Sequence, residues 1–175
     1  MSLLNVTKME IEKFLSENKR LMRDPEFYYG VDNNEDSVDK FTDDRLKVLC
    51  CFLSPGKNRA VSNTFNALNY LAHETLNDKV FVDCCYFPDD ANMEMLEKNN
   101  IPYIFGNVSH EPITSYDLVL MSCAVMPEVL NVSHYLDKSG IPLTIQEREK
   151  DNRIPFIAWG GAAANEAAIV LGELS

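Results

Sequence analysis

The sequence has no long apolar run, no cluster of basic residues and no signal-peptide pattern in its first residues. No stretch approaches the roughly 20 apolar residues of a membrane helix, and residues 1–6 lack the basic start and apolar core of a signal peptide. Sixteen basic residues stand against twenty-seven acidic ones, which gives a formal charge of −11. No Lys/Arg cluster is long enough to follow a phosphate backbone. We therefore expect a cytoplasmic protein whose partners are neither membranes nor nucleic acids.

The usual motifs of nucleotide, metal and catalytic sites are also missing. Neither GxGxxG nor GxxxxGK[ST] occurs, which argues against a dinucleotide site or a Walker-type phosphate site. Histidine occurs only at His73, His110 and His134, too dispersed to form a catalytic group, so we expect surface or structural histidines. We predict no catalytic and no metal-binding residue in this chain.

The five cysteines follow neither CxxC nor CxxxCxxC spacing. They occur in apolar stretches as Cys50-Cys51, Cys84-Cys85 and Cys123. Adjacent residues of a strand point to opposite faces, so neither pair is suited to a disulfide or a chelate. We interpret them as core cysteines in a reducing compartment, with a redox or metal role as the alternative.

The first 44 residues differ in character from the remainder. Apolar residues recur at helical spacing from residue 7 to 22, and Thr7 with Glu10 forms a capping box, which predicts an amphipathic helix. Asp24-Pro25 ends this pattern. Residues 28–44 are rich in Asp, Asn, Gly and Glu, which is typical of a linker or a mobile surface loop. We therefore divide the chain into an N-terminal helix with an acidic linker (1–44) and one domain (45–175).

The second part alternates short apolar runs with amphipathic segments. The runs at 46–53, 80–86, 117–123 and 154–159 predict four buried parallel strands, with helices over 61–76, from Pro88, over 127–139 and after Asn165 or a neighbour. Residues 103–105 suggest a brief extra strand, and Gly140 predicts a left-handed helix end. The expected fold is α/β, a flavodoxin-like or Rossmann-like three-layer sandwich with a mainly parallel sheet and its first strand inside.

Ligands of open α/β sheets bind at the carboxyl ends of the strands. Three segments fall there, 54–59, 122–126 and 160–165, and we expect them to converge. Their candidate ligand-binding residues are Ser54, Gly56, Asn58, Ser122, Ala124, Gly160, Gly161 and Asn165. A plain surface turn at the first segment and tight strand-to-helix packing at Gly160-Gly161 are the alternatives.

Five motifs occur in order within residues 45–175. They are Asn63 near the start of the first crossover helix, Phe87-Pro88-Asp89-Asp90 with Met93-Glu94-Met95-Leu96, the strand from Asp117 to Ser122, Gly140-Ile141-Pro142-Leu143 with Glu147-Arg148, and Gly160-Gly161 with Asn165-Glu166. Together they resemble the N-terminal cobalamin-binding-like domain of radical S-adenosylmethionine (SAM) enzymes.

The resemblance implies an accessory or truncated cobalamin-binding-like domain that serves a radical SAM catalytic domain or subunit. Ser122 and Gly160-Gly161 match positions where such domains contact the nucleotide tail of cobalamin. The DxHxxG motif that provides a cobalt ligand is replaced by residues 54–59 without histidine. We therefore expect any corrinoid to lack a protein histidine ligand. The iron–sulfur motif CxxxCxxC is absent as well, so we expect this chain to be non-catalytic alone and to hold no such cluster.

Two other functions remain open. A structural or interaction module could keep this fold and lose the ligand. A receiver-type signalling domain shares the topology, but it needs acidic residues where this chain has Ser54-Pro55 and Ser122-Cys123. The resembling domains add a fifth strand beside the fourth, which we expect to be missing here. The fourth strand would then be an edge that needs a cover. The N-terminal helix over residues 7–22 is one candidate, and a homodimer or a partner protein is the one we favour.

Overall fold

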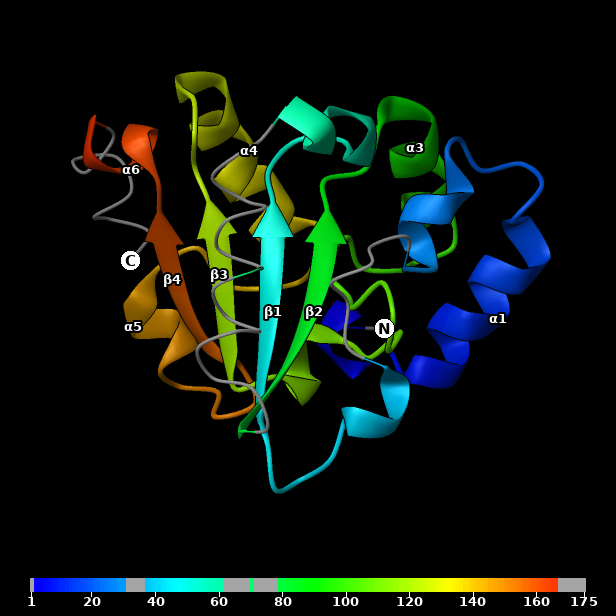
Figure 1. The fold of residues 1–175 in the computed structure, drawn as a ribbon, viewed down its shortest axis with the longest axis horizontal. Coiled ribbons are helices and arrows are strands. Elements are labelled where there is room, and N and C mark those ends of the chain that lie inside the picture. The colour runs from blue at the N-terminus through cyan, green and yellow to red at the C-terminus, as the bar shows by residue number, and fades with distance from the viewer. Residues whose placement is uncertain (1, 31–36, 62–69, 71–78, 167–175) are drawn as a thin grey trace.

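Four parallel strands form the centre of the computed structural model, which describes residues 2–30, 37–61, 70 and 79–166. They are β1 (Leu46–Phe52), β2 (Val80–Tyr86), β3 (Leu118–Ser122) and β4 (Phe156–Gly160), in the order β2-β1-β3-β4 (Figure 1). β1 pairs in parallel with both β2 and β3, and β3 pairs in parallel with β4. The predicted α/β fold, with one parallel sheet and its first strand inside, is confirmed, and the order is that of a flavodoxin-like sheet.

The strands form where apolar residues run without interruption. All seven residues of β2 are buried, as are the last five of β1. Such burial on both faces is typical of strands in parallel sheets. Neighbouring residues contribute to opposite faces, with Cys50 and Cys84 in one core cluster and Cys51 and Cys85 in another. The prediction that adjacent cysteines point apart is confirmed.

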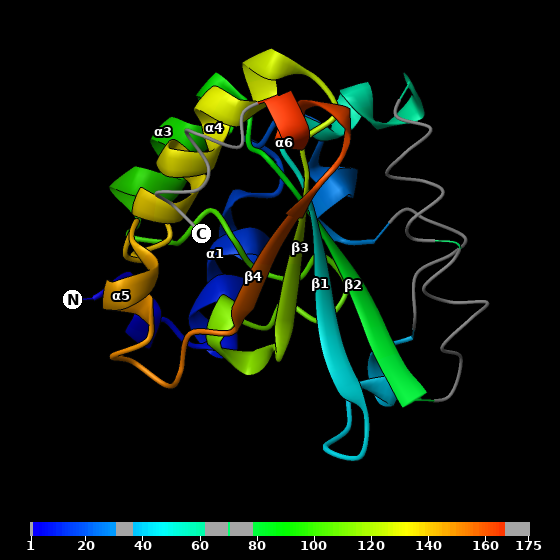
Figure 2. The same cartoon turned by 90° about the vertical axis from the view of Figure 1, so that its left-hand side faces the viewer.

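The helices are α1 (Lys8–Asn18), α3 (Asp90–Lys98), α4 (Met126–Asp137), α5 (Ile145–Arg148) and α6 (Ala162–Glu166). Short 3-10 turns lie at Leu3–Asn5, Pro25–Tyr28, Val38–Lys40, Gly56–Val61 and Ile113–Ser115. Figure 2 shows α1, α3 and α4 on one side of the sheet. The crossover helix predicted over 61–76, with Asn63 and His73, lies largely outside the described residues. Within the described ranges, no helix is long and apolar enough to cross a membrane.

Two predicted helix ends are confirmed in detail. Thr7 and Glu10 form the capping box at the start of α1, with the Thr7 N–H donating to Glu10 Oε2 at 2.8 Å. At the end of α4, Gly140 has a φ of +73°, and the N–H groups of Gly140 and Ile141 donate to the carbonyls of Asp137 and Leu136. These two hydrogen bonds form the Schellman motif, which needs a left-handed residue at the helix end, a conformation that glycine adopts freely.

One local prediction is wrong. Residues 103–105 form no strand: Phe105 makes only an isolated antiparallel bridge to Pro112. The segment after β1 contains the 3-10 turn Gly56–Val61, which is compatible with the expected surface turn. The helix expected from Pro88 is α3, and Asp89 is its N-cap and accepts the Asn92 N–H at 3.0 Å.

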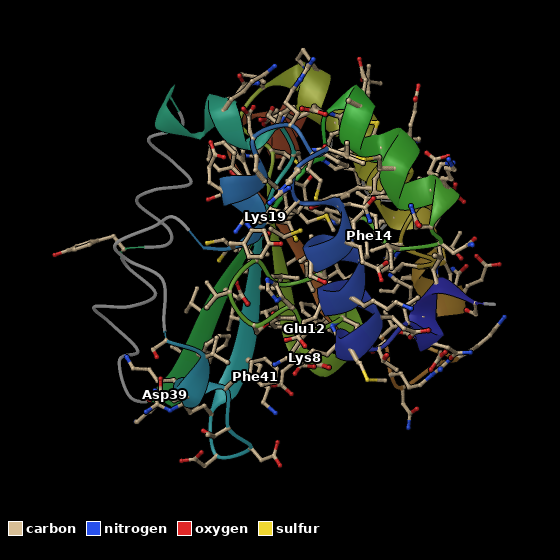
Figure 3. All side chains as sticks on the ribbon, turned by 90° about the vertical axis from the view of Figure 1, so that its right-hand side faces the viewer. Lys8, Glu12, Phe14, Lys19, Asp39 and Phe41 are labelled. Carbon is tan, nitrogen blue, oxygen red and sulfur yellow. The ribbon has the colours of Figure 1, made fainter. Side chains whose placement is uncertain are left out.

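The N-terminal segment packs into the same core as the sheet. Ile11, Phe14 and Leu15 of α1 belong to the cluster that covers the Cys51 face, and Figure 3 shows α1 lying against the body of the protein. Phe41 makes an edge contact with Phe81 of β2 at 5.0 Å between ring centroids. The parts of 28–44 around Tyr28 and Phe41 are thus packed, unlike the expected linker, because their aromatic rings bury apolar area. The boundary at residue 44 stays a prediction.

Asp83 lies in the middle of β2 and is fully buried. Its Oδ1 accepts the N–H groups of Cys84 and Val108 at 2.8 and 3.1 Å. Its Oδ2 accepts the Ser109 N–H at 3.0 Å and the Tyr116 hydroxyl at 2.9 Å. A buried carboxylate is tolerated only with such a set of donors. Asp83 therefore fixes the loop between α3 and β3 against the sheet.

Replacing Asp83 with asparagine should lower the free energy of unfolding by about 3 kcal/mol, because an amide group replaces one acceptor and leaves buried donors unpaired. Urea unfolding monitored by circular dichroism measures this change. Asp43→Asn, which removes an exposed carboxylate paired with Lys47, is the matched control and should have a much smaller effect. Equal effects of the two substitutions would contradict the role of Asp83.

Candidate functional site

The predicted ligand-binding segments meet at the carboxyl edge of the sheet. Ser54 follows β1, Ala124 follows β3 and Gly161 follows β4. The arrowheads of these strands point to the same edge of the sheet in Figure 1. Parallel strands bring these ends to one edge because each crossover returns the chain to the opposite end. Two sets of contacts then join the loops.

Glu128, in the first turn of α4, joins the loops after β1 and β3. The Ser54 hydroxyl donates to Glu128 Oε1 at 2.9 Å, and the N–H groups of Ala124 and Val125 donate to Oε2 at 2.7 and 3.2 Å. The carboxylate is 4% exposed and lies at a helix N-terminus, where negative charge is favourable. Sequence reasoning missed Glu128. One signal was available in the sequence. Glu128 is the third residue after Val125, the residue before the helix, and a Glu at this position commonly accepts a backbone N–H at the helix start.

Gly161 joins the loops after β3 and β4 by close backbone contact. Its φ is +119°, and a Cβ placed on it would lie 2.3 Å from the carbonyl oxygen of Cys123. The same carbonyl accepts the Ala163 N–H at 3.1 Å, and the Cys123 N–H donates to the Gly160 carbonyl at 2.7 Å. These contacts favour the tight-packing interpretation for Gly161.

Gly160 borders a cavity of about 140 Å³ on the Cys50 face of the sheet. The cavity is lined by Cys50, Leu120, Met121, Ser122, Ala158, Trp159 and Gly160. A Cβ on Gly160 would meet no atom within 4 Å, so this side of the cavity is open. A cavity of about 150 Å³ can hold one benzene-sized molecule. The space therefore suits a single ring or a small part of a larger ligand.

Ser122 supplies the cavity with an unused polar group. Its side chain is 3% exposed, and Oγ has no hydrogen-bond partner among the described residues. Leaving a buried hydroxyl unpaired costs about 1–3 kcal/mol, so a native protein that keeps one invites an explanation. A ligand that accepts from or donates to Ser122 would remove this cost.

The described residues of the cavity wall include no Asp, Glu, Lys or Arg. Burial raises the pKa of the Cys50 thiol to about 12, so this thiol is neutral at physiological pH. Burial likewise raises the pKa of Cys123, just beyond Ser122, to about 11. The loops after β1 and β3 contain the Glu128 carboxylate between them. Its negative charge would repel a phosphate group. The cavity is therefore suited to an apolar, uncharged group with one hydrogen-bonding atom.

The other candidate residues lie apart from this cavity. Phe27 of the N-terminal segment covers Gly56: a Cβ on Gly56 would lie 2.4 Å from the Phe27 ring. Asn58 is exposed in the 3-10 turn. Asn165 is exposed inside α6, so the prediction that it caps the last helix is wrong, because the helix already begins at Ala162, directly after Gly161.

The cysteine pairs stand side by side on neighbouring strands. Cys50 is in register with Cys84, and Cys51 with Cys85. Sequence reasoning excluded bonds within each pair but missed this alignment, because register depends on long-range strand pairing. The Cys85 sulfur lies 2.7 Å from the Tyr135 hydroxyl oxygen. Burial raises the pKa of Cys51 well above its usual range, which fits an unreactive core thiol at this position.

The described histidines are held by structural contacts. His110 Nε2 lies 3.0 Å from the Tyr28 carbonyl oxygen, and the His134 ring contacts Phe87 and Tyr103. They come from different elements and do not meet at the carboxyl edge. His73 lies outside the described residues.

One comparison with known proteins gives a match. A family model described as "Radical SAM proteins, N-terminal" matches residues 68–171, which is more than half of the chain. No curated protein and no solved structure matches the chain.

Gly161→Ala should lower the free energy of unfolding by about 2–4 kcal/mol, because the added methyl group meets the Cys123 carbonyl and the left-handed φ becomes strained. Gly160→Ala is the matched control and should be nearly neutral, since the space beside it is open. Chemical denaturation of both variants makes the comparison. Similar losses would show that the two glycines do not have these different roles.

The buried thiols should make the protein less stable in alkali. Unfolding returns Cys50 to a pKa near 8.5, whereas its pKa in the folded protein is about 12, so above roughly pH 8.5 the unfolded chain loses a proton that the folded chain retains. The free energy of unfolding should then fall by about 1.4 kcal/mol per pH unit for this thiol, up to pH 12. Urea titrations at a series of pH values measure the slope. Cys50→Ala should reduce it, and an unchanged slope would contradict this cause.

Proposed function

The chain belongs to the family of N-terminal regions of radical SAM proteins, and we propose that it serves a radical SAM catalytic unit as a corrinoid-binding accessory domain. The catalytic unit would be another domain or subunit, because it must contribute the CxxxCxxC thiolates that this sequence lacks. The proposed location is the cytoplasm, where reducing conditions keep buried thiols free.

The unpartnered Ser122 hydroxyl in the cavity at the carboxyl edge carries this proposal. A cavity with an open glycine wall at Gly160 and a single polar atom suits the ring-bearing tail of a corrinoid better than a phosphate or a metal ion. Its volume of about 140 Å³ accommodates one ring, so the remainder of such a ligand would extend beyond the edge of the sheet.

The loop after β1, residues 54–59, fits a corrinoid only if the protein provides no ligand to the cobalt. The segment 54–59 has no histidine, and Gly56 is covered by Phe27. When bound, cobalamin supplies radical chemistry at its cobalt. The proposed part of this chain is binding: Ser122 donates or accepts one hydrogen bond, Gly160 leaves room, and the neutral thiol of Cys50 lines the apolar wall.

A second candidate function is that of an interaction module that binds no ligand. Phe27 favours it, since its ring fills the space in front of Gly56 and packs edge-on against Tyr86 at 5.5 Å between centroids. A protein without a ligand at this edge gains stability from such a covering residue. The two functions differ in whether the purified chain retains a corrinoid.

Incubation with hydroxocobalamin, followed by desalting and an absorbance spectrum, tests the proposal. The wild-type chain should retain the corrinoid. Ser122→Ala should weaken binding about 2–10-fold, the loss of one hydrogen bond, without lowering stability, because the hydroxyl has no partner to lose. Ser16→Ala, on the exposed surface of α1, is the matched control and should bind as the wild type does.

The spectrum of the bound corrinoid should not change when His73, His110 or His134 is replaced. A spectrum with nitrogen coordination that disappears in one of these variants would contradict the proposed binding mode. No retained corrinoid, with a folded protein, would favour the interaction module instead.

A further inference from the structure

Residues 23–28 cross the carboxyl edge of the sheet at β1 and β2, and we call this segment the strap. Figures 1 and 2 both show its Pro25–Tyr28 turn beside the carboxyl end of β2. The Tyr28 side chain belongs to the core cluster on the Cys51 face, whereas the Phe27 ring packs against the cluster on the Cys50 face. The strap therefore bends around the edge where open α/β sheets bind ligands.

The Phe27 ring lies on the backbone of Gly56, in the loop after β1. A Cβ on Gly56 would lie 2.4 Å from Phe27 Cγ, closer than real side chains approach. The φ of Gly56 is not positive, so its backbone conformation does not itself call for glycine. The Tyr86 ring borders the same space, at 5.5 Å from the Phe27 ring between centroids and an interplanar angle of 69°. The structure thus uses the missing Cβ of Gly56 to let a ring lie against the backbone.

The Phe27 ring fills most of the room at this end of the edge. The cavity that remains between the strap, Gly56 and Tyr86 has a volume of about 20 Å³, which is enough for about one water molecule. Its rim carries charges of both signs, with Arg23 Nε at 3.8 Å from Asp89 Oδ2. A surface made of bare backbone and an aromatic side chain, without an excess of positive charge, is suited to a flat, uncharged ring.

The strap is held at both ends by contacts that do not involve Phe27. The side-chain amide of Asn92 in α3 accepts the Arg23 N–H at 3.0 Å and donates to the Arg23 carbonyl at 2.9 Å. It also donates to the Tyr28 hydroxyl oxygen at 3.3 Å, and both Asn92 and Tyr28 are buried. The Phe27 side chain itself is half-buried. Outward movement of residues 24–27 would therefore expose one ring and leave the ends of the strap in place.

The turn between these ends has a conformation that is costly for its sequence. Asp24 has φ +47° and ψ +53°, in the left-handed region that residues other than glycine adopt less readily. In the isolated chain, the contact of the Phe27 ring with Gly56 and Tyr86 offsets this cost. A ring that took over this contact would let the turn relax.

We propose that the surface over Gly56 and Tyr86 is a binding subsite for an uncharged planar ring, and that Phe27 occupies this subsite in the isolated chain. A ligand ring would displace the Phe27 ring, which would move outward with residues 24–27. Gly56, one of the ligand-binding residues predicted from the sequence, would contact the ligand once Phe27 has left.

This subsite is separate from the cavity that contains Ser122. Tyr86 is in register with Phe52, and Phe52 is in register with Ser122, so Tyr86 and Ser122 are two strands apart. Their backbones are therefore separated by about 10 Å along the carboxyl edge. A ring bound over Gly56 can belong to a ligand that does not reach Ser122, and the ligand need not be a corrinoid.

Benzimidazole, which is planar and uncharged at neutral pH, is the probe, and a titration followed by its NMR signals measures its affinity for the full chain. Phe27→Ala should bind the probe about 10-fold more tightly than the wild type, because the variant has no internal competitor. Adding Gly56→Ala to Phe27→Ala should weaken binding about 10-fold again, since the new Cβ takes the position of the ring.

Phe41→Ala is the matched control. Phe41 is also a half-buried ring of the N-terminal segment, but it contacts Phe81 near the start of β2, at the other end of the sheet. This variant should bind the probe as the wild type does. Circular dichroism shows whether each variant is folded, and the wild-type measurements below need no variant.

Hydrogen–deuterium exchange of the wild type distinguishes a displaceable ring from a permanent part of the core. The Phe27 N–H donates to the Asp24 carbonyl at 3.2 Å and should exchange faster at saturating benzimidazole, because the turn opens. The Arg23 N–H, which donates to Asn92, should keep its protection because this end of the strap stays fixed.

Four results would overturn the proposal. Neither the wild type nor Phe27→Ala binds the probe; both bind it equally, which would place it elsewhere, as in the Ser122 cavity; Phe41→Ala gains as much affinity as Phe27→Ala; or exchange of the Phe27 N–H in the wild type does not change. The last result would make Phe27 a permanent core residue. No measurement here uses a corrinoid, so the failure of corrinoid binding at Ser122 and the failure of this subsite are distinguishable.

Discussion

The burial of β1 on both faces, between β2 and β3, is the constraint on which the rest of the structure depends. Burial on both faces is typical of parallel sheets, and both neighbours of β1 are parallel to it, so each crossover returns along the sheet. The carboxyl ends of all the strands are then forced to one edge. Glu128 joins the loops after β1 and β3, and Gly161 joins those after β3 and β4. The candidate site is thus a consequence of how the sheet covers its central strand.

The chemistry available at this edge is that of a neutral, mostly apolar surface. Burial keeps the thiol of Cys50 protonated, and the carboxylate of Glu128 is occupied with three donors from the surrounding loops. The Ser122 hydroxyl remains as the polar atom of the cavity without a partner in the described part of the chain. Such a surface is suited to holding an uncharged group, and in the proposed function the bond-making steps belong to a cofactor or to a catalytic partner. This division of work agrees with a family defined by its place at the N-terminus of radical SAM proteins.

Local features could be predicted from the sequence because they depend on neighbouring residues. The four apolar runs, the capping box of Thr7 and the helix end at Gly140 follow from hydrophobic pattern and backbone preference. Contacts between distant segments could not be predicted. The sequence does not reveal that Phe27 covers Gly56, that Ser54 meets Glu128, or that the buried Asp83 fixes a loop 25 residues away. Each of these depends on the register and packing of the completed sheet.

The central claim is that the cavity at the carboxyl ends of β3 and β4 holds the ligand. Hydrogen–deuterium exchange of the chain with and without hydroxocobalamin tests it most directly, because exchange reports protection segment by segment. We predict slower exchange in peptides that cover residues 118–126 and 156–165, with exchange in α1 unchanged. Protection confined to α1, or no protection at any segment while the corrinoid stays bound, would contradict it.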